Sequence, residues 1–159
     1  MRKTLLIILT LSLLVAGAAL AEEDEEEEYV ELELLRVTAH QLNGRARPDK
    51  KSTVEVQFDY DDEVFPTGKW SADHKWVEVF GGEGGTVWCS VNYLNERKDV
   101  FTVYSLNPGK IRIRKYPGAG KVTGSVRKGQ KLEITQVVMG YGKCKRGWVD
   151  LSYFIEEEE

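Results

Sequence analysis

The sequence has few of the residues that carry chemistry. Its 159 residues include two cysteines, Cys89 and Cys144, and two histidines, His40 and His74. A Cys–His pair could in principle supply a thiol nucleophile, but the spacing lacks the C-x₂-C pairing of structural zinc sites. The acidic run at residues 59–63 lacks the alternating oxygen ligands and central glycine of a calcium loop. We therefore predict no catalytic residue, no metal site and no cofactor.

Only one long apolar run is present, from Leu5 to about Leu20. Arg2 and Lys3 precede it, and a small-residue triplet that ends at Ala21 closes it, which is the order of features in a secretory signal peptide. The run is shorter than the ~20 residues of a membrane-spanning helix, and an N-terminal membrane anchor is the alternative. We expect cleavage after Ala21, a secreted, extracellular or cell-envelope location, and no membrane segment in the mature chain.

Charge is unevenly distributed along the chain. Residues 22–28 read EEDEEEE, residues 36–96 have a net charge of −3, and residues 100–155 have a net charge of +9. The dense acidic run cannot bury apolar surface, so we interpret it as a solvated spacer. Alternatively, the acidic run repels anionic polymers, or it competes with them by binding the basic part of the same chain. The basic region should attract anionic polymers with strong salt dependence; the alternatives are solubility and neutralisation of the acidic ends.

The chain also matches itself. WCSVNYL at residues 88–94 has the Trp-to-Tyr spacing of WVDLSYF at 148–154, and VTAHQLN at 37–43 matches FTVYSLN at 101–107. Further landmarks follow in the same order, with Arg45, Arg47, Val54, Phe58 and Val64 opposite Arg112, Arg114, Val122, Val126 and Leu132. This order predicts two repeats of about sixty residues.

Each repeat is rich in strand signals. Runs such as KWVEVF, KIRIRKY and KLEITQVV contain β-branched and aromatic residues between Gly, Pro, Asn and Asp. We find no helical periodicity, although VELELLRV at 30–37 is ambiguous. Short strands in units of this size predict small barrels or sandwiches that hide their edges, and an interleaved single domain is the alternative. We expect a signal peptide at 1–21, a spacer and lead-in at 22–35, domains at 36–96 and 100–156, a linker at 97–99 and an acidic tail at 157–159.

The landmarks resemble the bacterial SH3 (SH3b) domains, whose outline is matched by LNGRARP, KGQKLEI, GWVDLSYF and the diverged TVWCSVNYL. The resemblance covers nearly all of the mature chain and implies an all-β fold class of two tandem small SH3-like β-barrels. It implies that Cys89, Val149, Leu94 and Phe154 are core residues, and that Tyr93 and Tyr153 lie on an exposed aromatic face. Two departures are Thr86-Val87-Trp88 in place of Gly-Trp, and Asp61 in place of the turn glycine Gly129.

These features predict an exported, non-enzymatic protein that recognises cell-wall peptide or glycan (peptidoglycan), or an anionic surface polymer. The alternative is an adaptor that docks a protein partner; no stacking-platform or groove-reading motif indicates nucleic acid. Aromatic side chains suit stacking on peptide or sugar, and we expect an aromatic cleft in the first repeat and an electropositive face in the second. The candidate ligand-binding residues are Trp70, Trp76, Tyr93, Tyr153, Trp148, Lys110, Arg112, Arg114, Lys115, Lys143, Lys145 and Arg146. Cys89 and Cys144 are a candidate disulfide pair for an exported protein.

Overall fold

The computed structural model describes residues 34–157, all of which belong to one compact unit. The expected signal peptide, the acidic run at 22–28 and the last two residues of the acidic tail lie outside the described residues. Within the described range the chain forms strands and two short 3₁₀ turns, and it contains no α-helix. The all-β prediction is therefore confirmed.

The strands fall into two sets that pair only among themselves across residues 34–157. The first set comprises β1 (Leu35–Val37), β2 (Gln41–Arg45), β3 (Val54–Asp59), β4 (Glu63–Val64), β5 (Pro66–Trp70), β6 (Trp76–Phe80), β7 (Thr86–Ser90), the 3₁₀ turn η1 (Val91–Tyr93) and β8 (Leu94–Asn95). The second comprises β9 (Phe101–Ser105), β10 (Ile111–Tyr116), β11 (Ala119–Val126), β12 (Lys131–Ile134), β13 (Gln136–Val138), β14 (Tyr141–Cys144), β15 (Gly147–Asp150), η2 (Leu151–Tyr153) and β16 (Phe154–Glu156).

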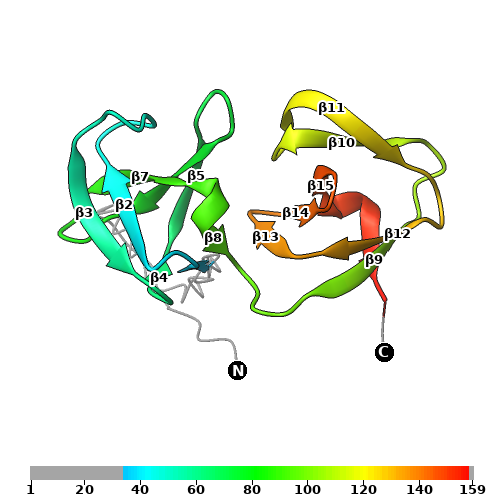
Figure 1. Ribbon diagram of the computed structural model, residues 1–159, viewed down its shortest axis with the longest axis horizontal. Coiled ribbons are helices and arrows are strands. Elements are labelled where there is room, and N and C mark those ends of the chain that lie inside the picture. Colours follow the sequence, from blue (N-terminus) through cyan, green and yellow to red (C-terminus); the bar gives the residue numbers. More distant parts are fainter. Residues whose placement is uncertain (1–33, 158–159) are drawn as a thin grey trace, which may run out of the picture. The chain divides into compact units, whose positions relative to one another are not determined.

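The two halves have the same sheet topology (Figure 1). The first half contains a sheet of order β3-β2-β7-β6-β5 and a smaller one of order β4-β1-β8; the second half contains β11-β10-β15-β14-β13 and β12-β9-β16. Each strand of the first half corresponds to the strand of the second half whose number is higher by eight, so that β2 corresponds to β10 and β7 to β15. All these pairings are antiparallel, as in small barrels built from meandering strands. The predicted pair of small SH3-like barrels is confirmed.

Strand register relates individual positions in the two halves. Arg45 lies opposite Trp88 between β2 and β7, and Arg114 lies opposite Trp148 between β10 and β15. Each strand also has a register shift at the same place, directly before its arginine. Tyr93 and Tyr153 both end a 3₁₀ turn. The two Trp-to-Tyr stretches thus occupy equivalent places.

The same register corrects part of the repeat alignment. The counterpart of Arg45 is Arg114, so the match of Arg45 with Arg112 is wrong by two residues. The Leu-Asn landmark also differs, because Leu42 lies within β2 whereas Leu106 lies in the loop before β10. That loop spans residues 106–110, two more than the β1–β2 loop at 38–40, and it contains the Pro-Gly pair. Val37 pairs with Leu94 and Ser105 pairs with Phe154, so Ser105 is the counterpart of Val37 and the match of 37–43 with 101–107 is wrong by four residues.

The hydrophobic core does not divide as the strand pairing does. One cluster lies wholly in the second half and includes Ile111, Ile113 and Val149. The other consists of first-half residues together with Val138 and Trp148 from β13 and β15. The second half therefore contributes side chains to the core of the first.

Hydrogen bonds between side chains and backbone reinforce this shared core. The side-chain nitrogen Nε2 of Gln136 donates to the carbonyl oxygens of Val91 and Leu94 at 2.8 and 2.6 Å. The backbone nitrogen of Val137 donates to Asn95 Oδ1 at 2.8 Å. Polar groups that are partly buried between packed strands need such partners. The end of the first half and β13 of the second are thereby held in a fixed register.

Candidate functional site

The site that best matches the sequence predictions is a groove of about 390 Å³ in the second half. Three bases line it, and they are Lys110, Arg112 and Arg114. Three aromatic residues line it as well, and they are Tyr141, Trp148 and Tyr153. The groove thus combines cationic donors with aromatic faces, and five of these six residues were sequence candidates.

Strand β10 places Arg112 and Arg114 on one side of the groove, and Lys110 directly precedes the strand. Its residues alternate between the two faces of the sheet, as successive side chains in a strand do. Ile111 is 6% exposed and Ile113 is fully buried, whereas Arg112 is exposed and Arg114 is partly exposed. The apolar residues fill the barrel core and direct the intervening arginines outward. Nη1 of Arg114 donates to the carbonyl oxygen of Gly120 at 3.0 Å, which holds one terminal nitrogen of the guanidinium.

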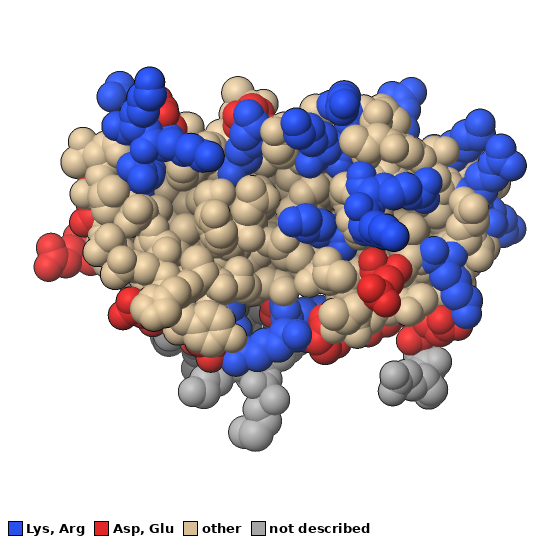
Figure 2. All heavy atoms as spheres, viewed as in Figure 1, with Lys and Arg blue, Asp and Glu red and all other residues tan. Residues whose placement is uncertain are grey.

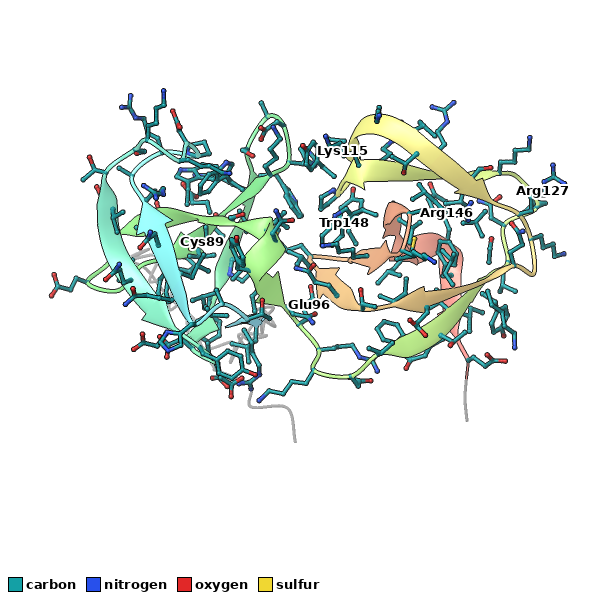
Figure 3. The ribbon with its side chains drawn as sticks, in the orientation of Figure 1. Cys89, Glu96, Lys115, Arg127, Arg146 and Trp148 are labelled. Carbon is teal, nitrogen blue, oxygen red and sulfur yellow. The ribbon has the colours of Figure 1, made fainter. Side chains whose placement is uncertain are left out.

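Trp148 sits between two cations on adjacent strands. It lies opposite Arg114 on one side and opposite Lys143 on the other, and Lys143 Nζ is 5.7 Å from the centre of its ring. Residues directly opposite in a sheet share a face. Gly147, with φ of 140°, permits this approach, because a Cβ there would lie 2.4 Å from the carbonyl oxygen of Arg114. In Figure 3, Trp148 lies among the strands of the second half.

Tyr141, another wall of the groove, is held from both halves. Its ring packs edge-on to Trp70 with centroids 5.9 Å apart, and Trp70 stacks on His74 at 5.3 Å. In turn, Nδ1 of His74 lies 2.6 Å from the carbonyl oxygen of Pro117 in the β10–β11 turn. The next residue, Gly118, has φ of 66° and lies against the Tyr141 hydroxyl, where a Cβ would approach to 2.8 Å. The first half therefore shapes the groove without lining it.

The bases of the groove are electrostatically available. None of Lys110, Arg112 and Arg114 forms an ion pair with a carboxylate among residues 34–157. Asp150 is the one acidic residue among the described residues that line the groove, and its Oδ1 caps η2 by accepting from the backbone nitrogen and hydroxyl of Ser152 at 3.0 and 2.6 Å. On the face drawn in Figure 2, Lys and Arg side chains are spread widely over the surface with few acidic groups between them.

Four cationic candidates lie outside the lining of the groove: Lys143, described above, and Lys115, Lys145 and Arg146. Lys115 lies over the ring of Tyr116 at 5.5 Å. Arg146 reaches β11, where it donates to the carbonyl oxygen of Ser125 at 3.4 Å, and Lys145 is exposed beside it. They belong to the same half and add to its positive potential.

Trp70, Trp76 and Tyr93 do not form the aromatic cleft that was expected in the first half. Trp76 is only 8% exposed, because it lies in β6 between β5 and β7, so it presents little surface to a ligand. Trp70 uses its ring on His74 and Tyr141. Tyr93 is 48% exposed and its counterpart Tyr153 is 47% exposed, in agreement with the predicted exposed face. Trp148, although a groove residue, is 3% exposed and offers only an edge.

Sequence reasoning missed Tyr141 as a groove residue. It was noted among the aromatic residues of the second half, but nothing in its local pattern, GYGKC, marks it as part of a site. Its role follows from the pairing of β14 with β15, which brings it across from Asp150. A comparison of the two repeats at this strand could have raised it as a candidate.

The two cysteines do not form the candidate disulfide. Both are free and buried, Cys89 in the core cluster of the first half and Cys144 in that of the second. Burial raises the pKa of the Cys89 thiol to about 12, so little of it is thiolate at neutral pH. Figure 3 shows Cys89 within the strands of the first half. Cys89 and Leu94 are fully buried and Val149 nearly so, as predicted, while Phe154 is only partly buried.

A second hollow of about 630 Å³ is lined by Tyr104, Lys131, Ile155 and Glu157, among others. Its lysine is already paired with Glu157, so it offers less to an anion than the groove does. Among residues 34–157 no group of three or more metal-ligating side chains comes together. No helix within this range has the length and apolar character needed to cross a membrane.

Comparisons with known proteins give distant structural similarities. No protein-family model matches the chain, and no curated protein matches it. Among solved structures it is similar to NlpC2 and NlpC1 from Trichomonas vaginalis, with 14% and 13% identity and TM-scores of 0.33 and 0.34. These alignments cover 79% and 93% of this chain and 48% and 51% of the NlpC chains, so the chain spans about half their length. It is also similar to the CBD of the endolysin LysPBC5, with 13% identity, a TM-score of 0.32, and coverage of 79% and 93% of the two chains.

Proposed function

We propose that this chain is an exported, non-enzymatic binding protein of the SH3b type, and that its second half binds an anionic polymer of the cell wall or cell surface. The groove beside β10 is the binding site. Its cations attract the polymer, and its aromatic residues pack against the sugar or peptide units between the charges.

One observation supports this proposal above the others. Lys110, Arg112 and Arg114 line a single groove, and no carboxylate of residues 34–157 pairs with them. In the first half, Arg36, Lys69 and Lys75 are each within 3.6 Å of a carboxylate, whereas Arg45, Arg47, Lys50 and Lys51 form no ion pair among residues 34–157. Cations that serve only solubility need not converge on one hollow beside aromatic side chains.

The test is retention of the protein on purified cell wall at rising salt. The variant K110Q/R112N/R114Q removes the three groove bases, and K121Q/R127Q/K128Q removes three exposed bases of the same half that do not line the groove. The parent and the second variant should be retained at low salt and released as salt rises, because screening weakens exposed charge interactions. The first variant should be retained poorly at every salt concentration. Equal retention of all three proteins would refute the groove as the site.

A protein-interaction adaptor is the second candidate. The first half exposes Tyr60, Phe80 and Tyr93, with 65%, 49% and 48% of each residue accessible. Aromatic residues are enriched in protein interfaces. Co-purification of a protein partner that depends on these residues, together with absence of wall binding, would favour this candidate.

A further inference from the structure

The bases of the groove form a regular row. Lys110, Arg112 and Arg114 are spaced two residues apart, and the two isoleucines between them point into the core. Arg112 and Arg114 lie in β10 and Lys110 directly precedes it; since two residues of a strand span about 6.6 Å, an extended chain places the row over about 13 Å. All three side chains line the same groove. A regular row of this kind complements a ligand with regularly repeated negative charge.

A second row crosses the first at Arg114. Arg114, Trp148 and Lys143 lie directly opposite one another on β10, β15 and β14. The indole therefore lies between two cations at one end of the cationic row. Arg114 uses one N–H on Gly120, and a guanidinium has five donors, so four remain for an anion. This end of the groove can hold an anionic group beside an apolar unit.

The first half keeps the arginine opposite its tryptophan but lacks the other bases at equivalent positions. Counting back from the paired arginines, Gln41 and Asn43 occupy the places of Lys110 and Arg112. Arg45, the counterpart of Arg114, donates to the carbonyl oxygen of Ser52 at 2.6 Å. The two halves share a fold but only one of them carries the cationic row.

On the basis of the proposed function, we infer that the groove binds a linear polyanion in an extended form along β10, with one anionic group at each base of the row. The anionic group is a phosphodiester or a carboxylate, since both accept hydrogen bonds from arginine and lysine. The affinity then depends on the number of connected anionic groups and increases until the row is filled.

The experiment is a calorimetric titration of the chain with oligo(glycerol phosphate) and with oligoglutamate, each of one to six units, at low salt. In at least one series the affinity should rise steeply up to about three to five units and level off beyond them, when the ~13 Å row is occupied. The series that shows this rise identifies the anionic group. Inorganic phosphate, as a single anion, should bind weakly.

The variant K110Q/R112N gives the second half two first-half residues, and K121Q/K128Q is its control with the same change of charge. The first should lower the affinity for the longest bound oligomer by about 10-fold at low salt, from two lost charge contacts. It should also reduce the dependence on length, and the control should change the affinity by less than about 2-fold. Circular dichroism melts confirm that both variants fold.

Binding that is equally strong at all lengths would overturn the extended mode while leaving the proposed function intact. Length-dependent binding that K110Q/R112N and K121Q/K128Q weaken equally would also overturn it, because the row would then act only through net charge. Failure of every oligomer to bind, together with loss of cell-wall retention, would reject the proposed function itself. Retention on cell wall without binding of any oligomer would reject only the polyanion row.

Discussion

Glu78 and Lys143 occupy equivalent positions with opposite charge. Glu78 lies opposite Trp88 between β6 and β7, and Lys143 lies opposite Trp148 between β14 and β15. The row that crosses the strands therefore consists of Arg45, Trp88 and Glu78 in the first half. In the second half it consists of Arg114, Trp148 and Lys143. This difference places a cation on each side of the tryptophan in the second half, and a cation and an anion in the first.

Lys143→Glu should weaken binding of the anionic polymer more than Lys143→Gln does. The glutamate would place a negative charge beside the groove at the position of Glu78, whereas glutamine only removes the positive one. Each step should change the binding free energy by about 0.2–1 kcal/mol, as expected for exposed charges. Titration of both variants at two salt concentrations measures the effect; equal affinities for parent, glutamine and glutamate would contradict it.

Glu78→Gln should destabilise the chain at neutral pH. The Glu78 carboxylate accepts from Thr67 at 2.7 Å and from Thr86 at 3.3 Å, and Lys69 lies 3.2 Å away. These interactions, the bond from Thr67 first, lower the pKa of Glu78 below its usual 4.5. Substitution should cost about 1–3 kcal/mol, the range for losing bonds to a charged, largely buried group.

The stability difference between the parent and Glu78→Gln should also depend on pH. Since the pKa is lower in the folded state, the carboxylate stabilises the fold above about pH 4.5, and this contribution is lost as the pH falls through the folded-state pKa. Urea unfolding at pH 7 and at successively lower pH should show the gap between the two proteins narrowing. A gap of constant size would show that ionisation of Glu78 does not contribute.

Gln136→Ala should destabilise both halves together. It removes two hydrogen bonds to the backbone of the first half and leaves the carbonyl oxygens of Val91 and Leu94 without this donor. The expected cost is about 1–3 kcal/mol. Because Val138 and Trp148 belong to the core of the first half, thermal unfolding should be a single transition by calorimetry and by tryptophan fluorescence. Two separate transitions, with only one shifted by the substitution, would contradict a shared core.

Cys89 and Cys144 should not react with a thiol reagent in the folded protein. Both are buried, and burial raises the pKa of Cys89 to about 12. A colorimetric thiol assay should detect two thiols only after denaturation. Rapid reaction of either residue in the native state would show that its strand opens locally.

The repeat and the strand content could be read from the sequence because they depend on local pattern. Val54, Phe58 and Val64 have as structural counterparts Val122, Val126 and Leu132, as the alignment predicted. Asp61 and Gly129, which were matched as turn residues, both have positive φ, at 68° and 77°. Such positions recur because a turn with this geometry tolerates only a few residue types.

The groove could be predicted only in part, because it depends on pairing between distant strands. Lys110, Arg112 and Arg114 stand out as alternate bases in KIRIR, but nothing local places Tyr141 beside them. The burial of Trp148 was also not predictable, since the core of the first half takes this side chain from the second. Site residues that come from one strand can be predicted from the sequence pattern. Site residues that are brought together by the pairing of distant strands cannot.

The most direct measurement is a map of backbone and indole amide chemical shifts during titration of the labelled chain with oligo(glycerol phosphate) or oligoglutamate. The largest changes should occur at residues 110–114 of the β10 region and at the Trp148 indole, with little change at residues 41–45 of β2. Changes centred on β2 and Trp88, or spread evenly over all exposed lysines and arginines, would contradict a binding groove in the second half.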